Sequence, residues 1–217
     1  LSRSKHGRTV ELAGHPPPPG DPPVPNSFVA ALAGRHLRFC ADWGVFSAQH
    51  IDAGTLLLFS VAAEGDRVPR VVDVGTGYGP LAVGLTVAGL AAQAVVTEVD
   101  AVALALALRN ARAAGVSMRG VLEDDPAVAP KSDLTVCNFP THLQRDRSDR
   151  LLRGLCQRAV SGRVLVVVHA SLESRFVKRF AEERVCAEVE RRSVHSVLAL
   201  MPYGMRHPST LREVRKV

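Results

Sequence analysis

Short apolar runs that end in a polar residue alternate with longer apolar-faced segments through most of the chain. The short runs are rich in β-branched residues and predict buried strands, whereas the longer segments predict helices. Strands are expected at 70–74, 94–98, 117–122, 133–138, 163–169, 185–192 and 195–201, and helices at 52–63, 79–90, 101–114, 147–160 and 171–183. Strands that alternate with helices in this way predict an α/β fold with a parallel, doubly wound sheet.

The segment before this alternation has a different composition. Prolines crowd residues 15–23, so an extended and disordered arm is expected over 1–25. Residues 28–34 favour a helix, and the alternating residues 36–40 favour a short strand whose partner is expected at 43–46. The resulting organisation is a Pro-rich arm (1–25), an N-terminal extension (26–66), a main domain (67–205) and a basic tail (206–217).

The strand expected at 70–74 is followed by three glycines at alternate positions, Gly75, Gly77 and Gly79. A glycine turn between a strand and a helix lets a ligand approach the backbone and directs amides of the helix N-terminus at it. The same turn also occurs for structural reasons alone. A nicotinamide dinucleotide fingerprint would require G-x-G-x-x-G, whereas this turn is G-x-G-x-G, and no hydride-transfer site accompanies it.

Two further strands end in polar residues. The apolar run before Glu98 is followed by Asp100, a natural N-cap for the helix expected at 101–114, and another apolar run ends at Asn138. The carboxyl ends of parallel strands lie along one edge of a sheet, so these residues are expected to line a single ligand crevice with the glycine turn.

Composition narrows the class of protein. The 217 residues, 47% of them hydrophobic, are enough for one ordinary domain with a full core. We expect neither a membrane span nor a secretory signal, since no uninterrupted apolar run is long enough. Four widely spaced cysteines, without C-x-x-C spacing, predict free thiols in a reducing, cytoplasmic setting and no structural metal site.

The formal net charge is +6, and basic residues gather in several places. A polyanionic partner such as RNA is one interpretation of these clusters, and solvated helix faces are the other. The clusters lie at 35–38, 145–153, 175–179, 191–192 and 206–216.

Four motifs in order resemble those of class I S-adenosylmethionine-dependent methyltransferases. They are the glycine motif 73–81, the acid Glu98, the Asn-Phe-Pro-Thr sequence at 138–141, and an upstream segment (44–58) with Gly-Val-Phe-Ser and Gly-Thr-Leu-Leu-Leu. The upstream segment is similar to that of the ribosomal-RNA guanine-N2 methyltransferases. The resemblance covers residues 39–202 and implies a Rossmann-like, mostly parallel seven-stranded sheet with an antiparallel last strand.

The resemblance also implies roles for individual residues. Contacts to the cofactor S-adenosyl-L-methionine are expected from Asp73, Gly75, Thr76, Gly77, Gly79, Glu98, Val99, Asp124 and Asn138. The adenine contact is assigned to Asp124, although its neighbours Glu123 and Asp125 are also candidates. Catalysis is assigned to Asn138, Phe139 and Pro140. Contacts to the substrate are assigned to Phe46, Ser47, Thr141 and His142.

Two positions depart from the family motif, because Phe139 replaces a proline and Thr141 stands where an aromatic residue usually stacks on the target base. Phe139 is therefore either a stacking surface or a core residue. Phe46 and Ser47 are expected to pack over the cofactor or substrate and Thr55 to cap a helix or line the pocket, and purely structural roles in the core or as helix caps are the alternatives for all three. Asn138 is expected to accept the hydrogens of a planar amine and orient its lone pair for methyl transfer.

The expected function is methylation of an exocyclic amino group of a base in RNA, with guanine N2 in ribosomal RNA or a ribosomal subunit as the leading target. Methylation of a protein glutamine amide or of DNA adenine is the enzymatic alternative. The third possibility is a methyltransferase fold that has lost catalysis and only binds RNA.

Overall fold

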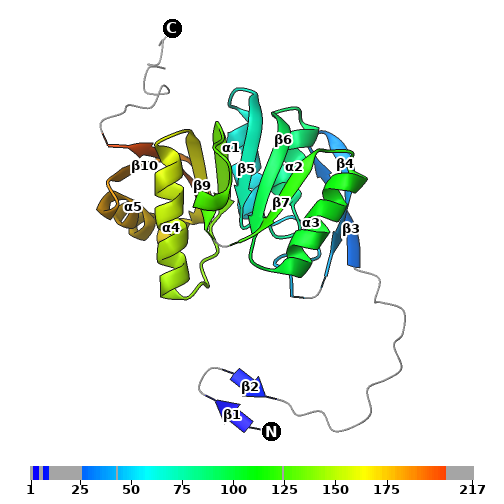
Figure 1. Ribbon diagram of the computed structural model, residues 1–217, viewed down its shortest axis with the longest axis horizontal. Coiled ribbons are helices and arrows are strands. Elements are labelled where there is room, and N and C mark those ends of the chain that lie inside the picture. Colours follow the sequence, from blue (N-terminus) through cyan, green and yellow to red (C-terminus); the bar gives the residue numbers. More distant parts are fainter. Residues whose placement is uncertain (1, 5–6, 10–25, 43, 124, 204–217) are drawn as a thin grey trace.

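A computed structural model describes residues 2–4, 7–9, 26–42, 44–123 and 125–203. Seven strands form the main sheet and five α-helices lie against it (Figure 1). The strands are β5 (Val68–Val74), β6 (Ala91–Glu98), β7 (Met118–Leu122), β8 (Leu134–Asn138), β9 (Arg163–His169), β10 (Val185–Arg192) and β11 (His195–Pro202). The helices are α1 (Ala53–Ala63), α2 (Pro80–Val87), α3 (Ala101–Ala113), α4 (Arg145–Ala159) and α5 (Glu173–Glu182), with short 3-10 turns η1 (Pro126–Val128) and η2 (Ala170–Leu172).

The strand order is β10-β11-β9-β8-β5-β6-β7. Strands β5 to β9 pair in parallel, whereas β11 is antiparallel to both of its neighbours, β9 and β10. The expected doubly wound sheet with an antiparallel last strand is confirmed. The chain winds outward from β5 towards β7, then returns to β8 on the other side of β5. The topological switch point therefore lies between β5 and β8.

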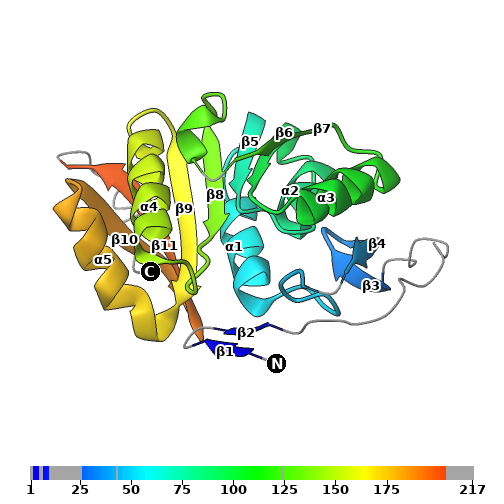
Figure 2. The ribbon, with the colours of Figure 1, turned by 60° about the horizontal axis from the view of Figure 1, so that its bottom comes forward.

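Both faces of the sheet are buried. Val164, Val166 and Val168 of β9 belong to one core with α4 and α5, whereas Leu165 and Val167 belong to a second core with α1 and α2. Figure 2 shows α4 and α5 side by side, away from α1, α2 and α3. Because helices cover both faces, the central strands read as continuous apolar runs and show no alternation of polar and apolar residues.

The N-terminal extension contains a hairpin in place of the helix expected at 28–34. Strand β3 (Asn26–Leu32) pairs antiparallel with β4 (Arg35–Ala41), so the predicted partner for 36–40 at 43–46 was also wrong. Ala33 and Gly34 both have positive φ, as a two-residue hairpin turn requires. The rings of Phe28, Phe39 and Tyr78 pack together with centroids 5.9 Å apart. This packing favours the strand over the local helix propensity.

The other expected ends of the chain are only partly described. Two short strands, β1 (Ser2–Ser4) and β2 (Gly7–Thr9), pair antiparallel within the arm that we expected to be disordered. The proline run and the basic tail lie outside the described residues and stay predictions. Within the described ranges, no helix is long and apolar enough to cross a membrane.

A buried asparagine joins the hairpin to the main domain. Asn110 of α3 is 1% exposed. Its amide donates to the carbonyls of Cys40 (2.9 Å) and Tyr78 (2.8 Å), and its carbonyl accepts from the Cys40 amide at 2.8 Å. One side chain therefore fixes β4 and the glycine turn to α3.

Replacing Asn110 with Leu, of similar volume, should lower the free energy of unfolding by about 2–4 kcal/mol, because three buried backbone groups lose their partner. Chemical denaturation measures the change. Arg109→Ala, on the exposed face of the same helix, is the matched control and should stay within about 0.5 kcal/mol of the parent. A loss no larger than that of the control would contradict the assigned role.

Candidate functional site

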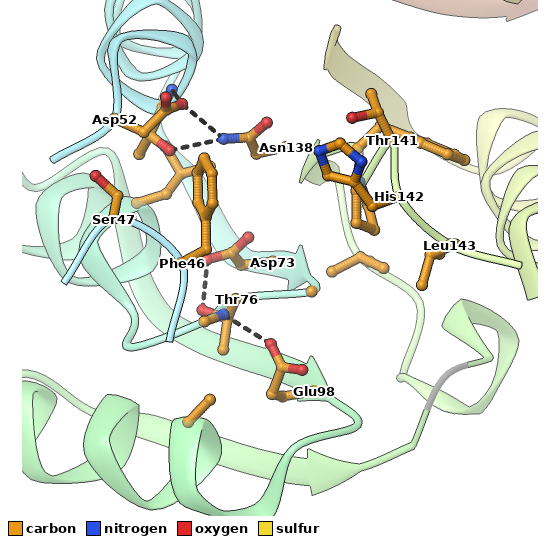
Figure 3. Close-up of a pocket in the computed structure, with 18 of the residues that line it drawn as sticks. Phe46, Ser47, Asp52, Asp73, Thr76, Glu98, Asn138, Thr141, His142 and Leu143 are labelled. Atoms are coloured by element: carbon orange, nitrogen blue, oxygen red, sulfur yellow. Dashed lines mark hydrogen bonds between the residues drawn. The ribbon is translucent and has the colours of Figure 1, made fainter. Parts of the chain in front are cut away.

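A cavity of about 740 Å³ opens at the carboxyl edge of the sheet, above the switch point between β5 and β8 (Figure 3). Most of the residues expected at the site line it together, although they come from segments far apart in the sequence. Gly79 is outside the lining and Asp124 is outside the described residues. The expected residues that line the cavity are Phe46, Ser47, Asp73, Gly75, Thr76, Gly77, Glu98, Val99, Asn138, Phe139, Pro140, Thr141 and His142.

Asp73, near the end of β5, is 2% exposed. The hydroxyl of Thr76 donates to its carboxylate at 2.7 Å. Burial raises the pKa of Asp73 to about 7, the Thr76 hydrogen bond opposes the shift, and the charge of Glu98 adds to it. Because burial disfavours the charged carboxylate, a nearby cationic ligand stabilises this carboxylate more than it would an exposed one.

The glycine turn exposes its backbone to this cavity. Gly75 and Gly77 have φ of 68° and 58°, and a Cβ at either position would meet nothing within 4 Å. The positive φ selects glycine there, and the open space leaves room for a ligand against the backbone. Gly79 also has a positive φ, of 88°, but the space beside it is filled, since a Cβ would lie 3.0 Å from the Cβ of Ala107. Its glycine serves the packing of the turn against α3.

Glu98 closes the turn from the end of β6. One carboxylate oxygen accepts from the Gly77 amide at 2.8 Å, and the other accepts from the amides of Val99 (2.8 Å) and Asp100 (3.2 Å). Asp100 caps α3 through Val102 and Ala103, as its position predicted. The carboxylate therefore accepts from three backbone amides and keeps about one acceptor site, on the oxygen that binds the Gly77 amide, for a hydroxyl group of a ligand.

Asn138 is half-buried at the end of β8, and its amide nitrogen donates to Asp52 and Thr55 (Figure 3). The next residue, Phe139, is 3% exposed, and its ring packs edge-on against Phe176 at 4.7 Å. Phe139 is therefore packed as a core aromatic at the edge of the cavity, and a role in stacking on a base stays a prediction. Its backbone and the exposed Pro140 still form the turn beside Asn138.

The loop before α1 forms another wall. Phe46 is 70% exposed and lines the cavity, and Figure 3 shows it across from Thr141 and His142. The Ser47 hydroxyl donates to the carbonyl of His50 at 2.6 Å, and the Tyr78 hydroxyl donates to the same carbonyl at 3.1 Å. The loop is thereby attached to the glycine turn, with an exposed aromatic ring at the mouth of the cavity.

Sequence reasoning missed several lining residues. Asp52 was placed in the upstream motif and at the start of a helix without a role at the site, and Thr55 was expected to cap the helix or line the pocket. Both contact Asn138. His169 at the end of β9 and His195 at the start of β11 also line the cavity, with ring centroids 5.5 Å apart. The rule that located Glu98 and Asn138, a polar residue at the end of a parallel strand, would also have found His169.

The structure shows the positions of two of the three acidic residues that follow β7. Glu123 lines the cavity, and its amide donates to the carbonyl of Glu98 at 2.9 Å. Asp125 caps η1 by accepting from the Ala127 amide at 2.8 Å. The assignment of the adenine contact to Asp124 stays a prediction.

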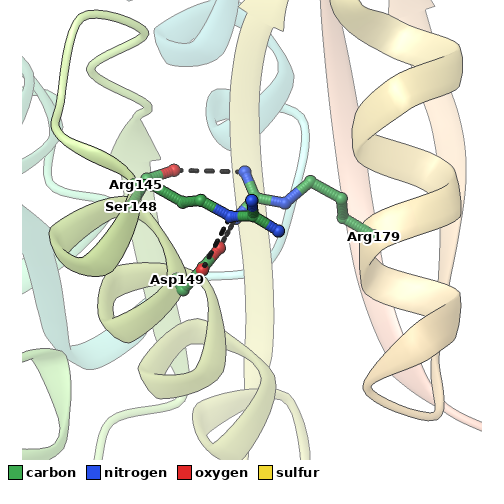
Figure 4. A network of polar contacts seen from close by, with 4 residues as sticks. All are labelled: Arg145, Ser148, Asp149 and Arg179. Atoms are coloured by element: carbon green, nitrogen blue, oxygen red, sulfur yellow. Dashed lines mark hydrogen bonds and ion pairs between the residues drawn. The ribbon is translucent and has the colours of Figure 1, made fainter.

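Part of the basic surface serves the fold. Arg179 of α5 forms an ion pair with Asp149 of α4 and donates to Ser148 at 3.1 Å, while Arg145 lies 3.9 Å from the same carboxylate (Figure 4). Other arginines also have structural partners, since Arg191 pairs with Glu64, Arg192 pairs with Glu173, and Arg158 donates to η1 and the turn after it. Among the basic residues beside the cavity, Arg147 lines it and is exposed.

The cysteines and acids do not assemble a metal centre in the part of the chain that the structure describes. All four cysteines are free thiols, with Cys137 and Cys156 buried. Burial raises the pKa of both buried thiols, so these are inert core residues.

The doubly wound sheet places a glycine turn, an acid and an asparagine, each at the end of a strand, around one cavity. This arrangement is typical of folds that bind a nucleotide or nucleoside. The chain belongs to the methyltransferase small domain family, whose model matches residues 36–196. It is 30% identical over 163 residues to ribosomal RNA small subunit methyltransferase C of Mannheimia succiniciproducens, and 38% identical over 133 residues to the protein of that name from Chromohalobacter salexigens.

These matches cover 71% and 58% of the chain but 49% and 39% of the relatives, so the chain spans half or less of their length. The fold is similar to that of the Thermus thermophilus 16S rRNA N2 G1207 methyltransferase, solved with AdoMet and guanosine. The TM-score is 0.70 at 24% identity, over 85% of this chain and 52% of that one. The predicted fold class and family are thus confirmed.

Asp73 should make stability depend on pH. The native state keeps a proton on Asp73 up to about pH 7, whereas the unfolded chain releases it near 3.8, so protonation stabilises the native state at acidic pH and this contribution is lost as pH rises through 7. Between pH 4 and 8 the free energy of unfolding should fall by about 2–4 kcal/mol more in the parent than in Asp73→Asn, whose side chain has no proton to release. Denaturation curves between pH 4 and 8 measure the difference. A gap that does not change with pH would contradict the assignment.

Proposed function

We propose that the protein is an S-adenosyl-L-methionine-dependent methyltransferase that modifies an exocyclic amino group of a base in RNA, with guanine N2 of ribosomal RNA as the preferred target. The observation that carries the proposal is that Asn138 shares one cavity with the glycine turn, Asp73 and Glu98. The names of the curated relatives support ribosomal RNA as the substrate class.

The residues present fit this cofactor. Gly75 and Gly77 leave the backbone open to its methionine part, and buried Asp73 suits its ammonium group. Glu98 offers an acceptor for a ribose hydroxyl at the end of the second strand of the domain. When bound, the cofactor supplies an electrophilic methyl group on a positively charged sulfur.

The contribution of the chain to the reaction is orientation. An exocyclic amine conjugated to a base is planar, so its lone pair is a poor nucleophile until the amine hydrogens are drawn to one side. The carbonyl oxygen of Asn138 accepts one of those hydrogens, and the turn at Phe139 and Pro140 places backbone acceptors beside it. Alignment supplies the acceleration, and a strong base is unnecessary because the proton leaves after the new bond has formed.

The surroundings of Asn138 favour a base as the bearer of the amine. Phe46 presents an exposed ring at the mouth of the cavity, whereas the ring of Phe139 packs into the core. Aromatic side chains stack on unpaired bases of RNA, and nearby arginines such as Arg147 attract its phosphates. A flat base can therefore enter between the loop at 44–50 and the turn at 138–143.

The decisive experiment is transfer of labelled methyl from S-adenosylmethionine to naked RNA, ribosomal particles, DNA and protein, followed by nucleoside and amino-acid analysis. Asn138→Ala should leave cofactor affinity nearly unchanged and lower turnover on RNA by about 100-fold or more, the scale of a lost transition-state contact. Asn26→Ala, an exposed asparagine of β3, is the matched control and should retain the parent activity.

Each outcome of the transfer assay distinguishes a function. Methylated guanine supports the proposal, whereas label on a glutamine side chain identifies a protein methyltransferase, and label in DNA adenine identifies a DNA enzyme. RNA binding without methyl transfer to any substrate identifies a fold that only binds RNA. Full activity of Asn138→Ala would remove the proposed mechanism.

Cofactor affinity should depend on Glu98. Glu98→Ala should weaken binding by about 10- to 150-fold, or about 1.5–3 kcal/mol, because it removes charge-assisted hydrogen bonds. Calorimetry measures the affinity, and Glu98→Gln, which keeps the shape and removes the charge, should lie between Ala and the parent. Glu182→Ala on the exposed side of α5 controls for the loss of one negative charge. Equal affinity of Glu98→Ala and the parent would show that another acid binds the ribose.

A further inference from the structure

We propose that Asp52 and Thr55 are positioning residues that hold the side-chain amide of Asn138 in one orientation, with its carbonyl oxygen turned into the cavity. The inference rests on the proposed function, since it assigns the origin of the acceptor geometry that amine methylation requires. Both residues belong to the start of α1, which lies 83–86 positions before Asn138 in the sequence.

The orientation follows from the hydrogen-bonding capacities of the partners. The amide nitrogen of Asn138 lies 3.0 Å from Oδ2 of Asp52 and 2.9 Å from Oγ1 of Thr55. An ionised carboxylate only accepts, so the group that faces Asp52 must be the NH2 group of the asparagine. The two acceptors use both amide hydrogens, and the carbonyl oxygen is left on the other side, as Figure 3 shows.

The two acceptors are themselves held in place. Asp52 is the N-cap of α1, and its Oδ2 also accepts from the Thr55 backbone amide at 3.0 Å. Leu58, one turn further along α1, is 0% exposed and anchors the helix in the core of the sheet. The acceptor pair is therefore part of a rigid element.

Gly54, between the two acceptors, explains how Asp52 can lie this close to the sheet. A Cβ at position 54 would be 2.9 Å from Oδ2 of Asp52 and 3.1 Å from a ring carbon of His195. A side chain at 54 would thus displace the carboxylate or the histidine. The structure therefore explains the identity of three residues in the Asp-Ala-Gly-Thr sequence at 52–55, namely Asp52, Gly54 and Thr55.

Loss of the acceptor pair has a definite chemical consequence. A freed asparagine amide can rotate by 180° and then directs its NH2 group at the amine of the substrate. Two donors cannot bond each other, so that orientation is unproductive, and the amine hydrogens lose their acceptor. Turnover should fall while the cofactor contacts, which come from β5, β6 and the glycine turn, stay intact.

Three variants separate this role from helix capping. Thr55→Val keeps the shape and removes the acceptor, Thr55→Ser keeps the hydroxyl, and Asp52→Ser retains a cap but is too short to reach Asn138. We expect Thr55→Val and Asp52→Ser to lower kcat by about 10-fold or more with cofactor Kd within about twofold of the parent, and Thr55→Ser to recover most of the loss. Thr86→Val, which removes a hydroxyl from α2 away from the cavity, is the matched control.

A double-mutant cycle and an activity-independent measurement complete the test. In the Asn138→Ala background, Thr55→Val should cause no further loss of kcat, because the amide that it positions is gone. In 15N-labelled protein, the side-chain amide hydrogens of Asn138 should exchange with water faster in Thr55→Val and Asp52→Ser than in the parent and in Thr86→Val.

The outcomes keep the two proposals apart. Additive losses in the Asn138→Ala background, equal losses in Thr55→Ser and Thr55→Val, or unchanged amide exchange would overturn the positioning role. If the parent transfers no methyl to any amine, the proposed function fails, and the amide exchange still decides whether Asp52 and Thr55 hold Asn138.

Discussion

The cavity depends on the reversal of winding between β5 and β8. The chain leaves β5 for α2 on one face of the sheet and leaves β8 for α4 on the opposite face. Adjacent parallel strands whose connections diverge leave a crevice at their carboxyl ends. The glycine turn and Asn138 stand on the two sides of that crevice, so the reversal of winding brings two distant segments to one cavity.

The crevice concentrates acceptors of hydrogen bonds. Asp73, Glu98 and Asn138 line it, and burial raises the pKa of Asp73 to about 7, with a smaller contribution from the charge of Glu98. Such an environment costs stability in the ligand-free protein and favours a ligand that brings positive charge and donors. A sulfonium cofactor with an ammonium group and hydroxyls, and a substrate amine, have that complementary chemistry.

Segments before the sheet complete the site. The β3–β4 hairpin is attached through Asn110 to the glycine turn, the loop at 44–50 is attached through Tyr78 to the same turn, and the start of α1 contacts Asn138. An extension that looked separate in the sequence thus supports both the glycine turn and Asn138, on the two sides of one cavity. Changes in it are expected to reach the chemistry through these few contacts.

The sequence by itself determined the strands of the main sheet, the glycine turn, and the strand-end residues Glu98 and Asn138, because these are encoded by local periodicity and by glycines that a turn requires. Only the tertiary structure decided that 26–32 is a strand, that Phe139 is buried against Phe176, and that Asp52 contacts Asn138. Each of these depends on a partner distant in the sequence, and a burial or hydrogen bond between distant segments leaves no local pattern.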